Sequence, residues 1–212
     1  MKTTIVYDCE FLTAEGSPRR FWCSPKDPDP VVVQIGAVKL GLVDDFEIMD
    51  TMRVYVVPKD RYGQNFDIDP FFTQLTGISS HTIEEKGVSL EEALRSLDMF
   101  SENSKFWSWG KDEFNMLAIS CFVANIHPPI PASRFDNACK LVLKAGMPYD
   151  DMTKTRSTEL VGYYNLEHPP LNAHDALDDA MSVAYVLKHL LEKGMLNGQD
   201  FMGDTDLYSH IM

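Results

Sequence analysis

The 212-residue sequence predicts a single mixed α/β domain, in which a five-stranded sheet is flanked by helices. Two observations carry this prediction. Runs rich in β-branched residues crowd the first 57 positions, and short strand-like runs alternate with helical patterns after them. Apolar residues make up 44% of the chain and charged residues 24%, a globular composition that excludes a disordered chain and a coiled coil. A chain of this length can bury a substantial core.

Three strands are expected first, arranged as an antiparallel meander. The runs at 3–7, 31–40 and 52–57 are apolar and rich in β-branched residues, and 41–45 supplies the turn between the second and third. Between the first two strands, residues 12–30 hold four prolines and predict a long loop.

Long loops in compact domains are usually functional or mobile, and this one leaves from the end of the first strand. We therefore expect it to contact a substrate, the alternative being that its aromatic residues only pin the loop to the body of the domain. The residues concerned are Arg19, Arg20, Phe21 and Trp22.

The remaining elements alternate between helix and strand. Ser89 with Glu92 fits a capping box that opens a helix, and Gly194 ends the last one. Helices are expected at 70–75, 79–85, 90–100, 112–122, 136–145, 157–164 and 176–193, and strands at 105–109 and 132–135.

The charge balance limits the nucleic acids that the chain could bind. Nineteen basic and thirty-two acidic residues give a net charge of -13, which disfavours broad binding to duplex nucleic acid but leaves room for a small footprint. A local basic strip could guide a strand, although scattered solvated cations are an equal alternative. The residues of that strip would be Lys140, Lys144, Lys154 and Arg156.

The four cysteines form no CxxC pair and have no histidine at zinc-finger spacing, so neither a zinc site nor a disulfide framework is indicated. This usage suits a reducing compartment. No apolar stretch approaches the roughly 18 residues of a membrane span. We therefore expect a cytoplasmic protein without membrane contacts.

Acidic residues at the end of the first strand suggest a metal site. Asp8 and Glu10 point to the same face of an extended backbone and can converge on one cation, unless they are simply a solvated pair. Asp112 follows a strand and a glycine, and His174 and Asp179 flank a helix start. Five residues apart on a helix, the last two would lie about 140° apart, so His174 must lie in the preceding loop.

Taken in order, these residues resemble the DEDDh 3′-to-5′ exonucleases of the ribonuclease H-like superfamily, related to proofreading exonuclease subunits, ribonuclease T and histone-mRNA-type exonucleases. Asp8-Cys9-Glu10 matches the first motif, Asp112 the second, and His174 to Asp179 the third. Further matches are Gln34–Val38 and Leu75–Ile78. The resemblance predicts an exonuclease domain over 1–193, with a proline-rich insertion at 12–30 and a C-terminal tail at 194–212.

The resemblance implies a function as well as a fold. Asp8, Glu10, Asp112 and Asp179 would hold two Mg²⁺ ions, with Mn²⁺ able to substitute, and His174 would be the general base. The substrate would be a single-stranded 3′ end, RNA slightly preferred over DNA, and the product a nucleoside 5′-monophosphate. The residues that the family would use to hold the terminal nucleotide are Phe11, Leu75, Thr76, Gly77 and Ile78.

Two other functions compete with this one. A catalytically silent relative could use the fold to bind nucleic-acid ends or a protein, because fold alone does not fix function. An HD-type phosphohydrolase could use His174-Asp175, but that class is helical and needs further histidine ligands. Exposed aromatic residues also leave a homodimer open, namely Tyr62, Phe66, Phe71 and Phe72.

Overall fold

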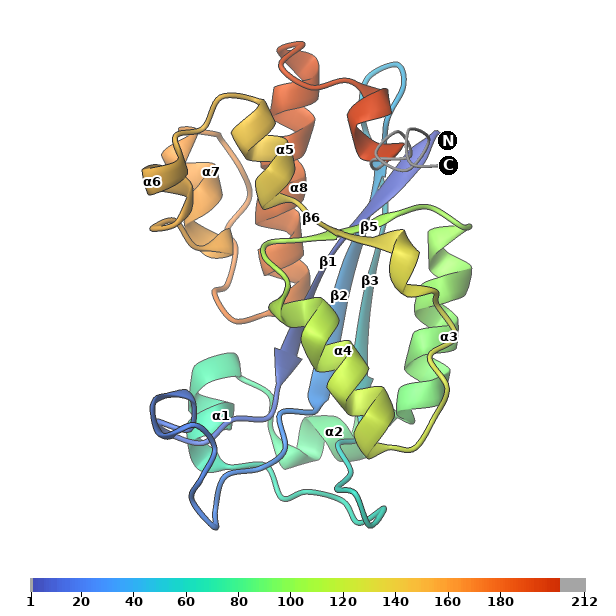
Figure 1. Ribbon diagram of the computed structural model, residues 1–212, viewed down its shortest axis with the longest axis vertical. Coiled ribbons are helices and arrows are strands. Elements are labelled where there is room, and N and C mark those ends of the chain that lie inside the picture. The colour runs from blue at the N-terminus through green and yellow to red at the C-terminus, as the bar shows by residue number, and fades with distance from the viewer. Residues whose placement is uncertain (1, 203–212) are drawn as a thin grey trace, which may run out of the picture.

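The computed structural model describes residues 2–202, which form one mixed sheet with helices on both faces (Figure 1). The sheet has six strands in the order β4-β3-β2-β1-β5-β6. They are β1 (Thr3–Phe11), β2 (Val32–Gly41), β3 (Ile48–Val56), β4 (Gly87–Val88), β5 (Phe106–Ser108) and β6 (Phe135–Asn137).

The expected antiparallel meander is present, because β2 pairs antiparallel with both β1 and β3. On the other side of β1, β5 and β6 add as parallel strands. The predicted count of five strands was one too low. The additional strand, β4, holds two residues and pairs with the end of β3, so it is too short to leave a periodic pattern in the sequence.

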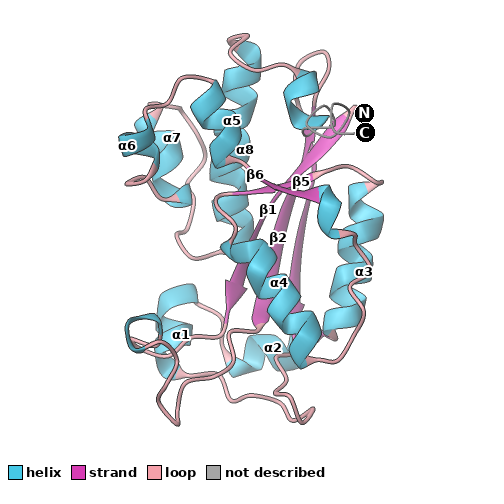
Figure 2. Ribbon diagram, in the orientation of Figure 1, coloured by secondary structure: helices cyan, strands magenta, loops and turns pink. Residues whose placement is uncertain are grey.

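The expected helices follow in order with small shifts at their ends, except that 157–164 divides into a 3-10 turn and a shorter helix. A further short helix, Tyr149–Met152, was not predicted. The bounds of the helices are α1 (Pro70–Thr76), α2 (Ser80–Lys86), α3 (Leu90–Ser101), α4 (Asp112–Val123), α5 (Cys139–Lys144), α6 (Tyr149–Met152), α7 (Leu160–Tyr163) and α8 (Ala176–Glu192). Short 3-10 turns occupy Pro18–Arg20, Ala132–Arg134, Ser157–Glu159 and Gly198–Met202. Figure 2 shows how the helices bracket the sheet.

One expected strand lies three residues later in the chain. Residues 132–135 were predicted as a strand, but Ala132–Arg134 form a 3-10 turn and β6 starts at Phe135. The following helix consequently begins at Cys139 rather than at Asp136. Pro131 fixes an extended conformation just before the turn, which moves the start of pairing downstream.

The two faces of the sheet have separate cores. Val6 and Val38 pack with α8, α5 and α7 on one face. Ile5 and Tyr7 pack with α3 and α4 on the other. Because side chains alternate along a strand, the even-numbered residues of β1 all face α8.

Residues 194–202, the part of the predicted tail that the structure describes, contribute to the core that packs around α8. Leu196 and Phe201 are buried there, and the Phe201 ring packs edge-on against Trp107 at 5.7 Å between ring centroids. The remainder of the predicted tail, residues 203–212, lies outside the described residues. None of the helices within 2–202 has the length and apolarity that a bilayer crossing requires.

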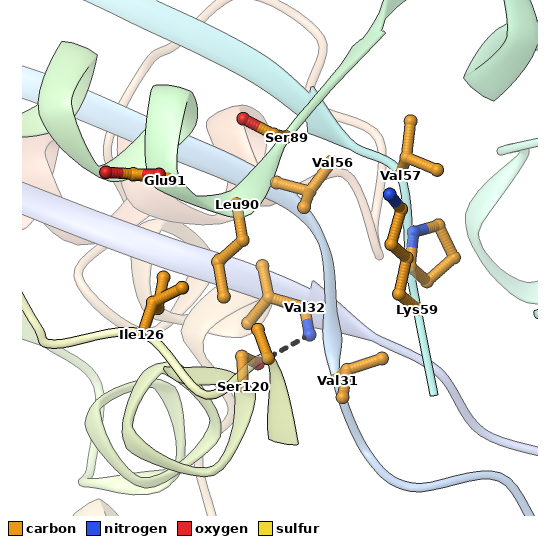
Figure 3. Close-up of a pocket in the computed structure, with 12 residues that line it drawn as sticks. Val31, Val32, Val56, Val57, Lys59, Ser89, Leu90, Glu91, Ser120 and Ile126 are labelled. Carbon is orange, nitrogen blue, oxygen red and sulfur yellow. Dashed lines mark hydrogen bonds between the residues drawn. The ribbon is translucent and has the colours of Figure 1, made fainter. Parts of the chain in front are cut away.

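A hydrogen bond ties α4 to the start of β2. The backbone N–H of Val32 donates to Ser120 Oγ at 2.9 Å, beside a register shift in the β1–β2 pairing (Figure 3). A cavity of about 160 Å³ lies here, and its lining includes Val56, Leu90 and Ile126. The lining is mainly aliphatic, so this cavity belongs to the packing between α3, α4 and the sheet.

The loop at 12–30 is long and irregular, as expected, but it is internally braced. The Asp27 carboxylate accepts hydrogen bonds from Ser17 Oγ at 2.8 Å, Arg20 Nη2 at 2.6 Å and the Ser24 backbone at 2.9 Å. These hydrogen bonds lower the pKa of Asp27 to about 2, and the bond from Arg20 has the largest effect. Phe21 is 86% exposed, so this aromatic ring does not pin the loop to the domain.

One of the aromatic residues expected at the surface is buried. Phe72 is fully buried in a small cluster with Leu12, Val33 and Ile83, because α1 turns this ring toward the end of the sheet. Tyr62 is exposed, as expected. Phe72 therefore cannot contribute to a dimer interface.

Candidate active site

Three acidic side chains converge at the C-terminal end of β1. One carboxylate oxygen each from Asp8, Glu10 and Asp179 lies within 4.8 Å of the other two, and all three residues are buried. We call these residues the acidic cluster. Asp8 and Glu10 were expected to share a face of the first strand, and the structure brings Asp179 of α8 to that face.

A glycine allows α8 to approach the sheet so closely. Gly36 of β2 pairs with Asp8 of β1. A Cβ atom at Gly36 would lie 2.1 Å from the backbone nitrogen of Leu177 and 2.2 Å from the carbonyl carbon of Ala176. Any side chain here would push the start of α8 away from β2, and Asp179 with it.

Polar contacts then fix the start of α8. Gln34 Oε1 accepts a hydrogen bond from the Ala176 backbone at 2.7 Å, and its Nε2 donates to Asp175 Oδ2 at 3.3 Å. Arg53 Nη2 pairs with Asp175 Oδ1 at 2.6 Å. Asp175 in turn accepts from the Leu177 and Asp178 backbone N–H groups as the N-cap. The sequence patterns did not predict this anchoring role for Gln34 and Arg53.

Burial and mutual repulsion raise the pKa values of the cluster. Burial raises the pKa of Asp8 well above its usual range, and the Glu113, Asp179 and Glu10 carboxylates raise it further. Burial followed by repulsion from Asp179 raises the pKa of Glu10 to about 8. Burial raises the pKa of Asp179 to about 7, although a hydrogen bond from the His174 backbone lowers this pKa in part. A cation would relieve this crowding of negative charge.

His174 lies immediately before the N-cap of α8, as expected, and lines the same cavity as the acidic cluster. Its backbone is left-handed, with φ of 62°. Burial lowers the His174 pKa, and the positive charge of Arg156 lowers it further. The imidazole is therefore kept neutral near pH 7, the form that accepts a proton.

The structure does not bring Asp112 to the acidic cluster. Asp112 is exposed at the first position of α4, whereas Glu113 is half-buried and has a fully buried Oε2 without a hydrogen-bond partner. Burial raises the pKa of Glu113 to about 7, and its carboxylate is the strongest charged influence on Asp8. Successive helical residues point about 100° apart, so only one of the two can face inward.

A cavity of about 550 Å³ opens over the cluster. Of the five residues expected to hold a nucleotide, Phe11 and Leu75 line it. Ile78 is 2% exposed and packs in the cluster around Phe72, so it supports the turn from below. Thr76 Oγ1 accepts from the Ile78 backbone at 3.1 Å and donates to the Phe72 carbonyl, which holds the turn around Gly77.

The loop at 12–30 forms part of the cavity wall, but through other residues than expected. The loop residues that line the cavity are Thr13, Ala14, Gly16 and Pro18. Within the part of the chain that the structure describes, the four residues from Arg19 to Trp22 do not line it. Lining residues that the sequence patterns did not place at the site are Phe71, Trp109, Thr155, Ser157 and Thr158.

The donor set fits a divalent cation. Carboxylate oxygens are the ligands that hard ions such as Mg²⁺ and Mn²⁺ prefer. Three such oxygens converge here on one face of the sheet, in surroundings that disfavour their charged form without a counter-charge. The site therefore suits metal-dependent chemistry.

Comparisons with known proteins identify a family and a fold for the chain. The sequence profile of the RNase_T family, described as Exonuclease, matches residues 5–187. A comparison with curated proteins gives no match.

Solved structures share the fold. The nuclease domain of 3′hExo, a DEDDh family member, superposes with a TM-score of 0.74 at 19% identity, over 92% of this chain and 94% of that one. The cell-death related nuclease CRN-4 gives 0.68 at 19% identity, over 92% and 65% of the two chains. Exonuclease I of E. coli gives 0.60 at 14% identity, over 91% and 41%. These structures share the fold, and because the family profile covers most of the sequence, the chain belongs to this exonuclease family.

Proposed function

We propose that the chain hydrolyses the terminal phosphodiester of single-stranded nucleic acid from the 3′ end and releases nucleoside 5′-monophosphates, with a slight preference for RNA. The observation that carries this proposal is the acidic cluster beside His174 in one open cavity. One structural neighbour was crystallised with rAMP and another with single-stranded DNA, which supports a nucleic-acid substrate.

Asp8, Glu10 and Asp179 would hold the metal, with Mg²⁺ as the physiological ion and Mn²⁺ as a substitute. When bound, divalent ions polarise the phosphoryl oxygens and stabilise the attacking and leaving oxygens, and we infer two of them. His174 takes a proton from the water whose oxygen attacks phosphorus, while the bond from phosphorus to the 3′ oxygen breaks. The departing 3′ oxygen takes up a proton from solvent and becomes the new 3′-hydroxyl of the shortened strand.

Phe11 and Leu75 are the proposed contacts for the terminal nucleoside, because both line the cavity. Stacking on aromatic and apolar side chains tolerates any base, which suits an enzyme that removes successive nucleotides. The family resemblance also assigns Thr76, Gly77 and Ile78 to this turn. Their proposed role is to shape the turn that presents Leu75.

A second metal needs a further carboxylate, which the start of α4 would supply. The resemblance assigns this role to Asp112, and we propose Glu113 instead because its orphaned oxygen is buried beside Asp8. Calorimetric titration with Mn²⁺ distinguishes the two. E113Q should weaken or remove one binding event and lower turnover, and D112N should leave both near wild type. The reverse result would return the role to Asp112.

The test of the whole proposal is degradation of 5′-labelled oligomers with matched DNA and RNA sequences, at several lengths, with Mg²⁺ or with EDTA. A ladder that shortens from the 3′ end only with metal is expected. Binding of the oligomers without release of mononucleotides would instead favour the catalytically silent alternative.

A further inference from the structure

Among the described residues that line the cavity, the only lysine or arginine is Arg156. The other charged lining residues are the three acids of the cluster, and the whole chain carries a net charge of -13. A polyanionic strand entering such a cavity meets repulsion at every phosphate that no cation covers. Arg156 is therefore placed where a compensating charge has the greatest effect.

Arg156 also differs from most other arginines of the chain in its pairing. Five of the seven arginines form ion pairs with carboxylates, namely Arg20, Arg53, Arg61, Arg95 and Arg134. Arg156 has no carboxylate within ion-pair distance in the part of the chain between 2 and 202, and it is exposed. Its guanidinium is free to bind an anion.

The backbone around Arg156 is held on both sides, which limits how far the side chain can stray. Trp109 Nε1 donates to the Thr155 carbonyl at 3.0 Å, and Ser182 Oγ of α8 donates to the Ser157 carbonyl at 2.6 Å. The backbone N–H of Arg156 donates to Glu159 Oε2 at 3.1 Å. These bonds anchor the segment to the turn before α4 and to the helix that carries Asp179.

The lysines expected to form a strip with Arg156 do not share its position. Lys140 pairs with Asp136 and Lys144 with Asp200, and both carboxylates already compensate these charges. Lys154 is exposed and is not among the described lining residues of the cavity. The expected strip thus reduces to a single cation at the site.

We propose that Arg156 binds the backbone phosphate on the 5′ side of the scissile one, and so positions the strand for cleavage. The inference rests on the proposed nuclease function. Arg156 lies at the rim on the side of His174, and a guanidinium matches two phosphate oxygens with two parallel hydrogen bonds. The scissile phosphate itself is expected beside the acidic cluster and its metal.

The test compares R156Q and R156K with wild type on two substrates. One is a single-stranded ten-residue oligomer, and the other is the p-nitrophenyl ester of a nucleoside 5′-monophosphate, which has one phosphodiester and no upstream phosphate. R156Q should raise KM for the oligomer about 10-fold or more, since a hydrogen bond to a charged group contributes about 1.5–3 kcal/mol. It should leave kcat on the oligomer within about threefold and leave the ester unaffected, and R156K should recover part of the loss.

The salt dependence of binding gives a second readout. For R156Q, the slope of log K against log salt should be shallower by about 0.7, the contribution of one phosphate contact in a single strand. K154Q is the matched control, because it removes an adjacent exposed charge that does not line the cavity, and its KM should stay within about twofold of wild type.

Three outcomes would overturn the proposal. An unchanged oligomer KM and salt slope in R156Q would mean that Arg156 does not touch the strand. An equal loss of kcat on oligomer and ester would place Arg156 at the scissile phosphate. An effect of K154Q as large as that of R156Q would indicate only a diffuse surface charge. If wild type cleaves neither substrate, the nuclease proposal fails separately, and anisotropy with a labelled oligomer in Ca²⁺ still tests whether R156Q weakens binding.

Discussion

The two faces of β1 are both buried, yet they contain opposite kinds of residue. Toward α3 and α4 the strand presents Ile5, Tyr7 and Cys9, which pack in a continuous core. Toward α8 it presents Val6 and then Asp8 and Glu10, which are 8% and 9% exposed. Burying carboxylates costs free energy unless a partner compensates them. The buried carboxylates on the face toward α8 therefore lower the stability of the metal-free protein. The apolar packing on the other face offsets this loss.

The difference arises from the element that covers each face. Helices α3 and α4 cover their face with apolar side chains, such as Leu94, Leu97 and Leu117. Helix α8 begins directly over Gly36 and brings polar groups of its first turn to the sheet. Substitutions on neighbouring residues of one strand can thus separate catalysis from stability.

The largest expected effect is the contrast between two single variants at neighbouring residues of β1, Asp8→Asn and Cys9→Ala. Asp8→Asn should abolish turnover because it would remove a proposed metal ligand, while the metal-free protein should be at least as stable as wild type because a buried, mutually repelling carboxyl group is lost. Cys9→Ala should keep turnover within about threefold and lower stability by about 1 kcal/mol. Mononucleotide release measures the turnover of each variant, and thermal unfolding measures its stability. Appreciable turnover by purified Asp8→Asn would remove this residue from the mechanism.

His174→Ala should lower kcat by about 10² to 10⁴-fold near neutral pH, the usual contribution of a general base. Metal binding should persist, because the acidic cluster remains complete. Calorimetry with Mn²⁺ checks the binding, and a pH profile checks the rate. A turnover equal to wild type at pH 7 would show that His174 does not act as the base.

Gly36→Ala should lower kcat by about 10²-fold, because a Cβ atom 2.1 Å from the Leu177 backbone forces the start of α8 outward, and misplacements near 1 Å have effects of that size. Ala37→Gly changes the next residue on the opposite face, which is fully buried. It should leave kcat near wild type and lower stability by about 1 kcal/mol. Similar kcat losses in the two variants would contradict the division between faces.

The smallest effect is a pH dependence of stability in the metal-free protein. Glu10 and Asp179 have folded-state pKa values raised to about 8 and about 7, so the folded state binds more protons than the unfolded state between about pH 4 and 8. Its stability should therefore fall as pH rises through this range. Melting temperatures in EDTA and in Mn²⁺ measure this, and Mn²⁺ should raise Tm more at pH 8 than at pH 5.5. An increase in metal-free stability over the same range would contradict the buried-cluster description.

Local patterns predicted much of the molecule because they depend on neighbouring residues. Strand alternation placed Asp8 and Glu10 on one face, and helix geometry placed His174 in the loop before α8. The N-cap at Ser89 likewise follows from its own sequence context, and its side chain accepts from Glu92 as expected. Such features need no knowledge of the remainder of the chain.

Other features depended on packing between distant segments. The sequence contains Asp112 and Glu113 side by side, and only the way α4 lies against the sheet turns Glu113 inward. The burial of Phe72 and Ile78 depends on how α1 and its turn meet the end of the sheet.

By itself, the sequence determined the kind of chemistry, since two carboxylates on one strand end and a histidine before an acidic helix start are local arrangements. The tertiary structure decided how closely α8 approaches the sheet at Gly36, and which residues share the cavity, including Arg156 at the rim. The physical reason is that an extended strand has a fixed period of two, whereas the approach of a helix to a sheet is set by steric contacts between residues far apart in the chain.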